Sequence, residues 1–113
     1  MTPARAPHAV LWHPAARDDL TQLDAIDLAI GDAALAAIDD VAAHRKHGKA
    51  LGPRHTSGDL TGFFRVKFDL AGRRPERFRL VYEQPDDHTI CVWALGERAE
   101  QAVYHEAASR VDD

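Results

Sequence analysis

Three successive strands between residues 63 and 95 constrain the fold more than any other feature of this sequence. The first two segments, FFRVKFDL and RFRLVYE, alternate apolar with basic residues, and the third, TICVWAL, is apolar throughout. Side chains in a strand point alternately to opposite faces, so the alternation separates an apolar face from a basic one. The apolar face carries Phe64, Val66, Phe68, Leu70, Phe78, Leu80 and Tyr82, and the basic face carries Arg65, Lys67, Arg77 and Arg79.

A sheet with this pattern presents a cluster of fixed cations, which indicates a phosphate-binding surface. A solvated sheet face is the alternative, but aligned cations on one face repel one another, which makes that alternative less favourable. The third strand, apolar on both faces, is typical of a central strand that is covered on both sides.

At 113 residues the chain has the size of one domain, and we expect a single domain over residues 1–113. The one cysteine, Cys91, excludes an intrachain disulfide framework and favours a reducing, cytoplasmic location. No apolar run reaches the length of a membrane helix, and the opening MTPARAPHAV lacks the apolar core of a secretory signal. The histidines show no closed metal-ligand spacing, so we expect neither a metal nor another cofactor.

The segments around the three strands predict one more strand and three helices. Residues 9–13, AVLWH, predict a short strand, and Pro14 then begins a helix whose apolar stripe continues, after a break at residues 24–27, as far as His47. Residues 48–62 are rich in Gly, Pro, Ser and Thr and predict a loop. The segment ERAEQAVYHEAASRV predicts a C-terminal helix. The expected fold class is α+β: one compact antiparallel β-sheet with an N-terminal helical hairpin on one face and a C-terminal helix at its edge.

Positive charge is concentrated in the middle of the chain, although the net charge is −4. Residues 1–43 carry −5, residues 44–79 carry +7 and residues 80–113 carry −6. Such asymmetry is the electrostatic footprint of a surface that meets a polyanion. The candidates for these contacts are Arg45, Lys46, Lys49, Arg54, Arg73, Arg74 and Arg77.

Three sequence segments occur in this order along the chain: FRVKF, RFRLVYE and LGERAEQAVYHEAASR. With ARDDLTQLD after the first strand and GDLTG before the second, they resemble the RelE/ParE family of toxins from bacterial type II toxin–antitoxin systems, and the RelE branch in particular. The likeness covers nearly the whole chain. Its most specific part is RLVY, an apolar strand, Gly-x-Arg and then VYxEAxxR. It implies the RelE-like fold, a compact antiparallel sheet with two helices on one face and a basic concave face opposite.

The resemblance implies a ribosome-dependent endoribonuclease that cleaves mRNA in the ribosomal A site and so inhibits translation. In that reaction the ribose 2′-hydroxyl attacks the adjacent phosphate and the 5′-oxygen leaves. By position in the motifs, Arg65 and Lys67 match two catalytic-face lysines, Arg79 a phosphate-stabilising arginine, Arg98 the arginine at the leaving group, and Tyr104 the tyrosine that orients the substrate. The seven basic candidates named above would then bind RNA and the ribosome. Glu97 stands where many relatives are basic.

Other functions remain open at this point. A ParE-like toxin would act on DNA gyrase without cutting RNA, although that branch typically lacks the set of cations present here. An inactivated member would serve as an antitoxin-binding partner in a repressor complex. In each case the family implies a cognate antitoxin, and we expect an acidic, partly disordered segment that folds on binding. Two alternatives concern single residues. Tyr104 would only pack between the C-terminal helix and the sheet instead of orienting the substrate. His105 would have a catalytic role.

Overall fold

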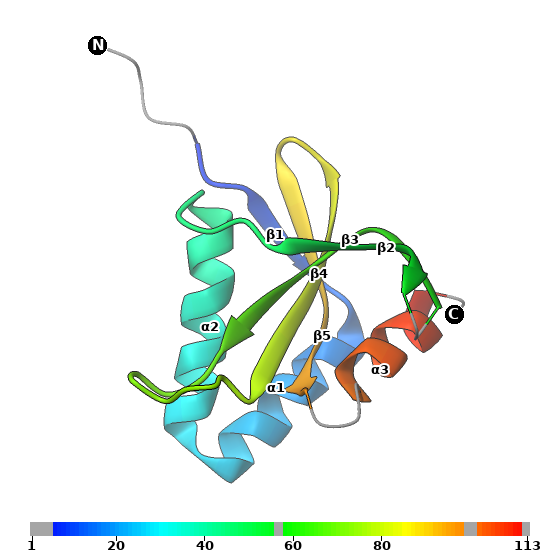
Figure 1. The fold of residues 1–113 in the computed structure, drawn as a ribbon. Helices are drawn as coiled ribbons and strands as arrows, with labels where there is room; N and C mark the ends of the chain where they lie inside the picture. The colour runs from blue at the N-terminus through cyan, green and yellow to red at the C-terminus, as the bar shows by residue number, and fades with distance from the viewer. Residues whose placement is uncertain (1–5, 56–57, 99–101, 112–113) are drawn as a thin grey trace.

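The computed structural model describes residues 6–55, 58–98 and 102–111. Its elements run in the order β1 (Ala9–Trp12), α1 (Pro14–Ile26), α2 (Leu28–Ala42), β2 (Lys49–His55), β3 (Gly58–Phe68), β4 (Phe78–Asp86), β5 (Thr89–Glu97) and α3 (Ala102–Val111). A five-stranded sheet forms the centre, and the helices pack against it (Figure 1). The expected α+β class, N-terminal helical hairpin and C-terminal helix are therefore confirmed. Within the described residues, no helix combines the length and the hydrophobicity needed to span a bilayer.

The sheet has the strand order β1-β5-β4-β3-β2. Strands β3, β4 and β5 pair antiparallel, as predicted, and β2 also pairs antiparallel with β3. In contrast, β1 pairs parallel with β5, from Ala9 opposite Thr89 to Trp12 opposite Val92, so the sheet is mixed rather than wholly antiparallel. The residues of β1 contain no signal for strand direction. Parallel neighbours need a long crossover, which the two helices and three strands between β1 and β5 supply.

The prediction of a loop over residues 48–62 is wrong, because this segment contains β2 and the first part of β3. Its glycines mark irregularities inside strands. The register between β2 and β3 shifts on both sides of Gly52, and Gly52 and Gly62 have φ values of 82° and 85°, which other residues rarely adopt. The composition of a bulged strand thus resembles the composition of a loop.

Gly48 fixes the point where β2 begins. Its N–H donates a hydrogen bond of 2.8 Å to the hydroxyl of Tyr82, whose pKa is raised by burial. A Cβ atom at this position would lie 2.9 Å from the carbonyl oxygen of Arg65 and from the Tyr82 ring, so only glycine fits without movement. Before it, α2 ends at Ala42 rather than at the predicted His47, because His44 adopts a left-handed φ of 62°.

Polar side chains cap the two helices of the N-terminal hairpin. The helix α1 begins at Pro14, where the Nδ1 atom of His13 accepts a hydrogen bond of 3.1 Å from the Ala15 N–H. Asp27 caps α2 by accepting a hydrogen bond of 2.9 Å from the Ala29 N–H. A break between the two helices is therefore present, but α1 continues through Ile26 and the break is confined to Asp27, the last residue of the predicted range 24–27.

Two apolar clusters cover the two faces of the sheet. On one face, α1 and α2 pack on the predicted apolar side chains, among them Val66, Phe68, Phe78, Leu80 and Tyr82. On the other face, α3 packs through Val103, Tyr104 and Ala107 on Leu60, Phe63, Val81 and Ala94. The last helix thus lies on the face opposite the hairpin, rather than at the edge as expected, and it shares that face with the cations.

Candidate nucleic-acid interface

A cavity of about 310 Å³ lies on the basic face of the sheet, beside α3. Its walls come from β2, β3, β4, α3 and the residue that follows β5. It is lined by Lys49, Ala50, Leu51, Arg65, Lys67, Arg79, Arg98 and Tyr104, and none of these described lining residues is acidic. The five residues predicted to be catalytic thus meet in one cavity, together with Lys49 from the predicted binding set.

Strand pairing places the cations side by side. Lys49 on β2 is the cross-strand partner of Arg65 on β3, and Lys67 on β3 is the partner of Arg79 on β4. Partners in neighbouring strands, like positions two apart in one strand, point to the same face. Arg98 joins the group through the backbone, because its N–H donates a hydrogen bond of 2.8 Å to the carbonyl of Arg77, the residue before β4. The register therefore converts a linear alternation into a compact group of positive charges.

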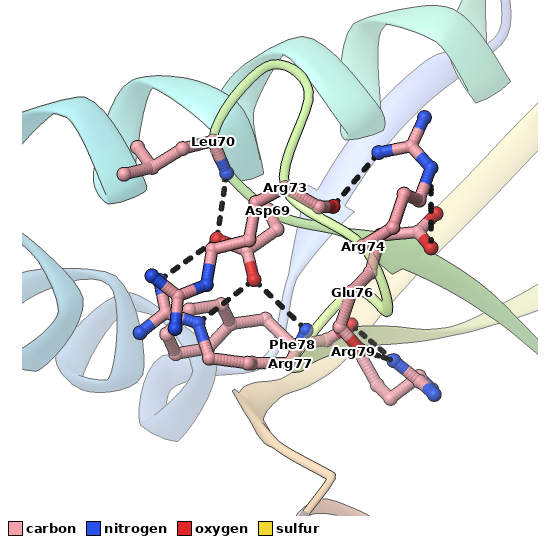
Figure 2. Close-up of polar contacts among 8 residues, drawn as sticks. All are labelled: Asp69, Leu70, Arg73, Arg74, Glu76, Arg77, Phe78 and Arg79. Atoms are coloured by element: carbon pink, nitrogen blue, oxygen red, sulfur yellow. Dashed lines mark hydrogen bonds and ion pairs between the residues drawn. The ribbon is translucent and has the colours of Figure 1, made fainter.

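Arg79 is the buried cation of this group, with 4% of its surface exposed. Its Nη1 atom donates hydrogen bonds of 2.8 Å to the backbone carbonyls of Glu76 and Phe78 (Figure 2). The carbonyls fix the guanidinium in place without neutralising it. A buried charge without a counterion is costly, so an anion in the adjoining cavity would be bound favourably.

Carboxylates accompany other cations of the described chain but not those of the cavity. Ion pairs involve Arg45, Lys46, Arg74, Arg77 and Arg110. Within residues 6–55, 58–98 and 102–111, no ion pair joins a carboxylate to Lys49, Arg65, Lys67, Arg79 or Arg98. The charge of the cavity is therefore available to an anionic ligand.

Arg77 has a structural partner instead. Its Nε and Nη2 atoms donate hydrogen bonds of 2.8 and 2.9 Å to the two carboxylate oxygens of Asp69, and its backbone N–H donates to the same carboxylate at 2.9 Å. The Asp69 side chain is fully buried and also accepts a bond of 2.7 Å from the Leu70 N–H. The Arg77 guanidinium and these N–H groups hold the pKa of Asp69 well below its usual range. Figure 2 shows the guanidinium groups of Arg77 and Arg79 pointing to opposite sides.

Tyr104 both packs and lines the cavity. It is 6% exposed, belongs to the apolar cluster between α3 and the sheet, and forms part of the cavity wall. The two roles considered for this residue are therefore compatible, because a packed ring with one side on a cavity is held ready for a ligand.

The helix that carries Tyr104 is anchored by Arg110. The Arg110 guanidinium donates hydrogen bonds of 2.7 and 3.1 Å to the carboxylate of Asp19 on α1, and one of 2.7 Å to the carbonyl of Trp93. Asp19 also accepts a bond of 3.0 Å from the Leu95 N–H. Sequence reasoning missed this anchor, because the partners stand 91 positions apart. The local sequence indicates only the i,i+4 pair of Arg110 with Glu106, whose carboxylate lies 3.6 Å from the Arg110 guanidinium.

The predicted binding residues divide into groups. Lys49 lines the cavity, and Arg73 is exposed between β3 and β4. The others that the structure describes are engaged by carboxylates: Arg45 by Asp39 and Asp40, Lys46 by Asp40, Arg74 by Glu76 and Arg77 by Asp69. Arg54 belongs to β2 and His105 to α3, but their side chains lie outside the described part of the structure. Lys49 is thus the member of this set that joins the catalytic candidates.

A second cavity, of about 610 Å³, adjoins the first at the end of the sheet where β4 begins and β5 ends. It shares Lys67, Arg79 and Arg98 with the first cavity. Its other walls are formed by Pro75, Glu76, Arg77 and Glu97. Three cations are therefore shared by a cavity whose described lining includes no carboxylate and a cavity that also contains carboxylates.

Comparison with known proteins identifies this architecture. The family described as ParE toxin of type II toxin-antitoxin system, parDE, matches residues 10–102, and the chain belongs to this family. The chain is therefore a toxin of a type II toxin–antitoxin system, and its family implies an antitoxin partner. The resemblance to the RelE/ParE family is confirmed.

A solved structure has a similar fold. It is that of an arginine-to-alanine double mutant of the E. coli toxin RelE in the free state, with a TM-score of 0.60 and 17% sequence identity. The match covers 93% of this chain and 98% of that chain. At this identity the likeness shows the fold alone, and it confirms the RelE-like arrangement of helices and sheet. No curated protein sequence matches the chain.

Proposed function

We propose that this toxin is a ribosome-dependent endoribonuclease that cleaves mRNA in the ribosomal A site. The observation that carries the proposal is Arg79, a buried arginine without a carboxylate partner among the described residues. It faces a cavity into which Arg65, Lys67, Arg98 and Tyr104 also converge. A preorganised group of fixed cations is the arrangement that stabilises charge developing on a phosphate.

The residues of the cavity fit the parts of an in-line phosphoryl transfer. The 2′-oxygen forms a bond to phosphorus, and the bond from phosphorus to the 5′-oxygen breaks. The 2′-proton must be removed, and the negative charge on the leaving oxygen must be stabilised. Arg79 would hold the charged phosphate through its guanidinium. Arg65 and Lys67 would stand near the attacking oxygen, with Lys67 as the candidate base, and Arg98 would stabilise the leaving oxygen. Tyr104 would stack on an unpaired base.

Action on DNA gyrase is the second candidate function. The matching family carries the name of the ParE toxins, and that observation favours it. A toxin that acts by binding a protein has no need of an uncompensated cation buried beside a cavity, and this argument favours RNA cleavage. Both candidates require neutralisation in a resting cell, so we expect an acidic antitoxin segment that covers the cavity and lies beside α3.

The deciding experiment adds the purified toxin to a bacterial translation extract and maps cuts on a reporter mRNA by primer extension. Cuts that require the ribosome support the proposal. Arg79→Ala should greatly reduce them, whereas Arg45→Ala, which removes a cation already paired with Asp39 and Asp40, should not. Intact mRNA together with gyrase-linked DNA breaks would establish the second candidate instead.

A further inference from the structure

The cavity at the end of the sheet has no role in the chemistry described so far. It shares Lys67, Arg79 and Arg98 with the cationic cavity, so a strand of RNA whose phosphate lies on these three cations extends into both. We propose that this second cavity is a subsite for a nucleobase next to the cleaved bond, and that Glu97 reads an exocyclic amino group of that base. The inference rests on the proposed endoribonuclease function.

The charges of the two cavities set the direction of the strand. The first adds Lys49 and Arg65 to the shared cations, which suits the next phosphate of the backbone. The second adds Arg77, whose charge is already paired with Asp69, and the carboxylates of Glu76 and Glu97, which repel a phosphate and accept hydrogen bonds from N–H groups. The sugar–phosphate backbone therefore continues toward β2, and a base turns toward the end of the sheet.

Size and shape agree with a base as the occupant. The volume of about 610 Å³ falls within the usual range of roughly 300–1,000 Å³ for small-ligand pockets. Pro75 supplies an apolar surface for the face of a planar ring, and the other lining residues are charged. The wall that carries Pro75 and Glu76 is held in place by the bonds between Asp69 and Arg77.

Of the two carboxylates, Glu97 is the one available to a ligand. Glu76 lies 3.7 Å from the guanidinium of Arg74, which occupies part of its acceptor capacity. Glu97 is exposed at the end of β5, and among the described residues none forms an ion pair or a side-chain hydrogen bond with it. The Glu97 charge acts on the nearby Arg77 guanidinium, but among the described residues no group is hydrogen-bonded to its carboxylate oxygens, which can therefore accept from a donor on a ligand.

The functional groups of the four nucleobases predict which of them the subsite prefers. Adenine and cytosine present an exocyclic amino group at C6 and C4 and guanine presents one at C2, whereas uracil has no amino group and carries a carbonyl oxygen on each side of its N3–H. A carbonyl oxygen facing the Glu97 carboxylate is repelled. The subsite should therefore discriminate against uracil at one of the two nucleotides that flank the cut.

The test is single-turnover cleavage on ribosomes programmed with messages that differ only at one flanking nucleotide at a time. Wild-type toxin should cut uracil-containing messages about tenfold more slowly than the others at one of the two positions. Replacing guanine by inosine, or adenine by unsubstituted purine, removes only the amino group and should give a similar loss. Glu97→Gln and Glu97→Ala should reduce these ratios to within about twofold. The matched control is Asp87→Asn, which removes a carboxylate in the exposed β4–β5 turn and should leave the ratios unchanged.

Three results would overturn the subsite: equal wild-type rates with every base at both positions, selectivity that the Glu97 variants retain, or a loss in those variants that is the same for every base. The third would assign Glu97 to proton transfer. If wild-type toxin makes no ribosome-dependent cut at all, the proposed function itself fails, and the subsite fails with it.

Discussion

The carboxylate of Asp69 and the guanidinium of Arg77 are joined by two parallel hydrogen bonds, 2.8 and 2.9 Å long, which close the connection between β3 and β4. The cationic cavity begins directly beyond this pair. Lys67 stands two residues before Asp69, and Arg79 stands two residues after Arg77. The Glu76 carbonyl that holds Arg79 belongs to the same connection. The pair therefore holds the connection that positions Arg79, although neither Asp69 nor Arg77 lines the cavity of about 310 Å³.

Removing the charge of Asp69 should destabilise the fold. Asp69→Asn weakens the bonds to Arg77 and to the Leu70 N–H, and it leaves the buried side chain with fewer acceptors. We expect the free energy of unfolding to fall by about 2 kcal/mol near neutral pH, as measured by denaturant titration. The control is Arg45→Ala, which breaks an exposed pair and should have little effect. Equal stability of wild type and Asp69→Asn would mean that the pair is dispensable.

The same pair predicts a loss of stability in acid. The folded structure lowers the pKa of Asp69, first of all through the guanidinium of Arg77. A group whose folded pKa is depressed contributes stability that is fully present above its unfolded pKa, about 4, and is lost as the pH falls toward the folded pKa. The difference in unfolding free energy between wild type and Asp69→Asn should therefore shrink below about pH 4. A difference that stays constant through this range would contradict the assignment.

Strand alternation allowed much of the site to be predicted from the sequence. Which face a side chain occupies depends only on its position within its own strand, so Arg65, Lys67 and Arg79 were placed on one face before any pairing was known. How closely these cations lie together depends on the register, and the antiparallel pairing of β3 with β4 makes Lys67 and Arg79 partners. The motif positions of Arg98 and Tyr104 completed the group.

Non-local pairing could not be predicted in the same way. Lys49 reaches the cavity because β2 pairs with β3, yet the glycines that permit the bulges of this pairing made the segment resemble a loop. Arg45 was included as a binding residue from charge alone, and Arg77 was also placed on the basic face by strand alternation; only the structure reveals the carboxylates that engage them. The partnership of Asp19 with Arg110 joins α1 to α3 and has no local pattern.

The pairing of Asp19 with Arg110 should show strong coupling in a double-mutant cycle. Both side chains are largely buried, so Arg110→Ala leaves a carboxylate without its partner and should lower the free energy of unfolding by about 3 kcal/mol. The variant that carries Asp19→Ala as well should lose less than the sum of the single losses, by on the order of 1–3 kcal/mol. The measurement is denaturant unfolding of the four proteins. Additive losses would show that α3 is held by apolar packing alone.

Salt dependence should distinguish free cations from paired ones. Lys49 lines the cavity, and no carboxylate of the described residues pairs with it, whereas Arg45 is already balanced by Asp39 and Asp40. Each phosphate that the protein neutralises releases counterions, so Lys49→Ala should reduce the slope of log affinity against log salt by about 1. Arg45→Ala should leave the slope nearly unchanged. The measurement is ribosome binding over a salt series, and equal slopes for the two variants would show that Lys49 makes no phosphate contact.

Arg79 should be required for the chemical step more than for binding. Arg79→Ala removes the buried guanidinium, and its single-turnover rate on ribosome-bound mRNA should fall by on the order of 10²–10³ while ribosome affinity changes little. Arg79→Lys keeps the charge but cannot reproduce both the carbonyl bonds and a bidentate grip on phosphate, so it should recover only part of the rate. If fixed cations carry the reaction, His105→Ala should keep most activity, and the rate should rise with pH without the bell that a pair of histidines produces. A bell-shaped wild-type profile that disappears in His105→Ala would move the central catalytic role from the arginine to that histidine.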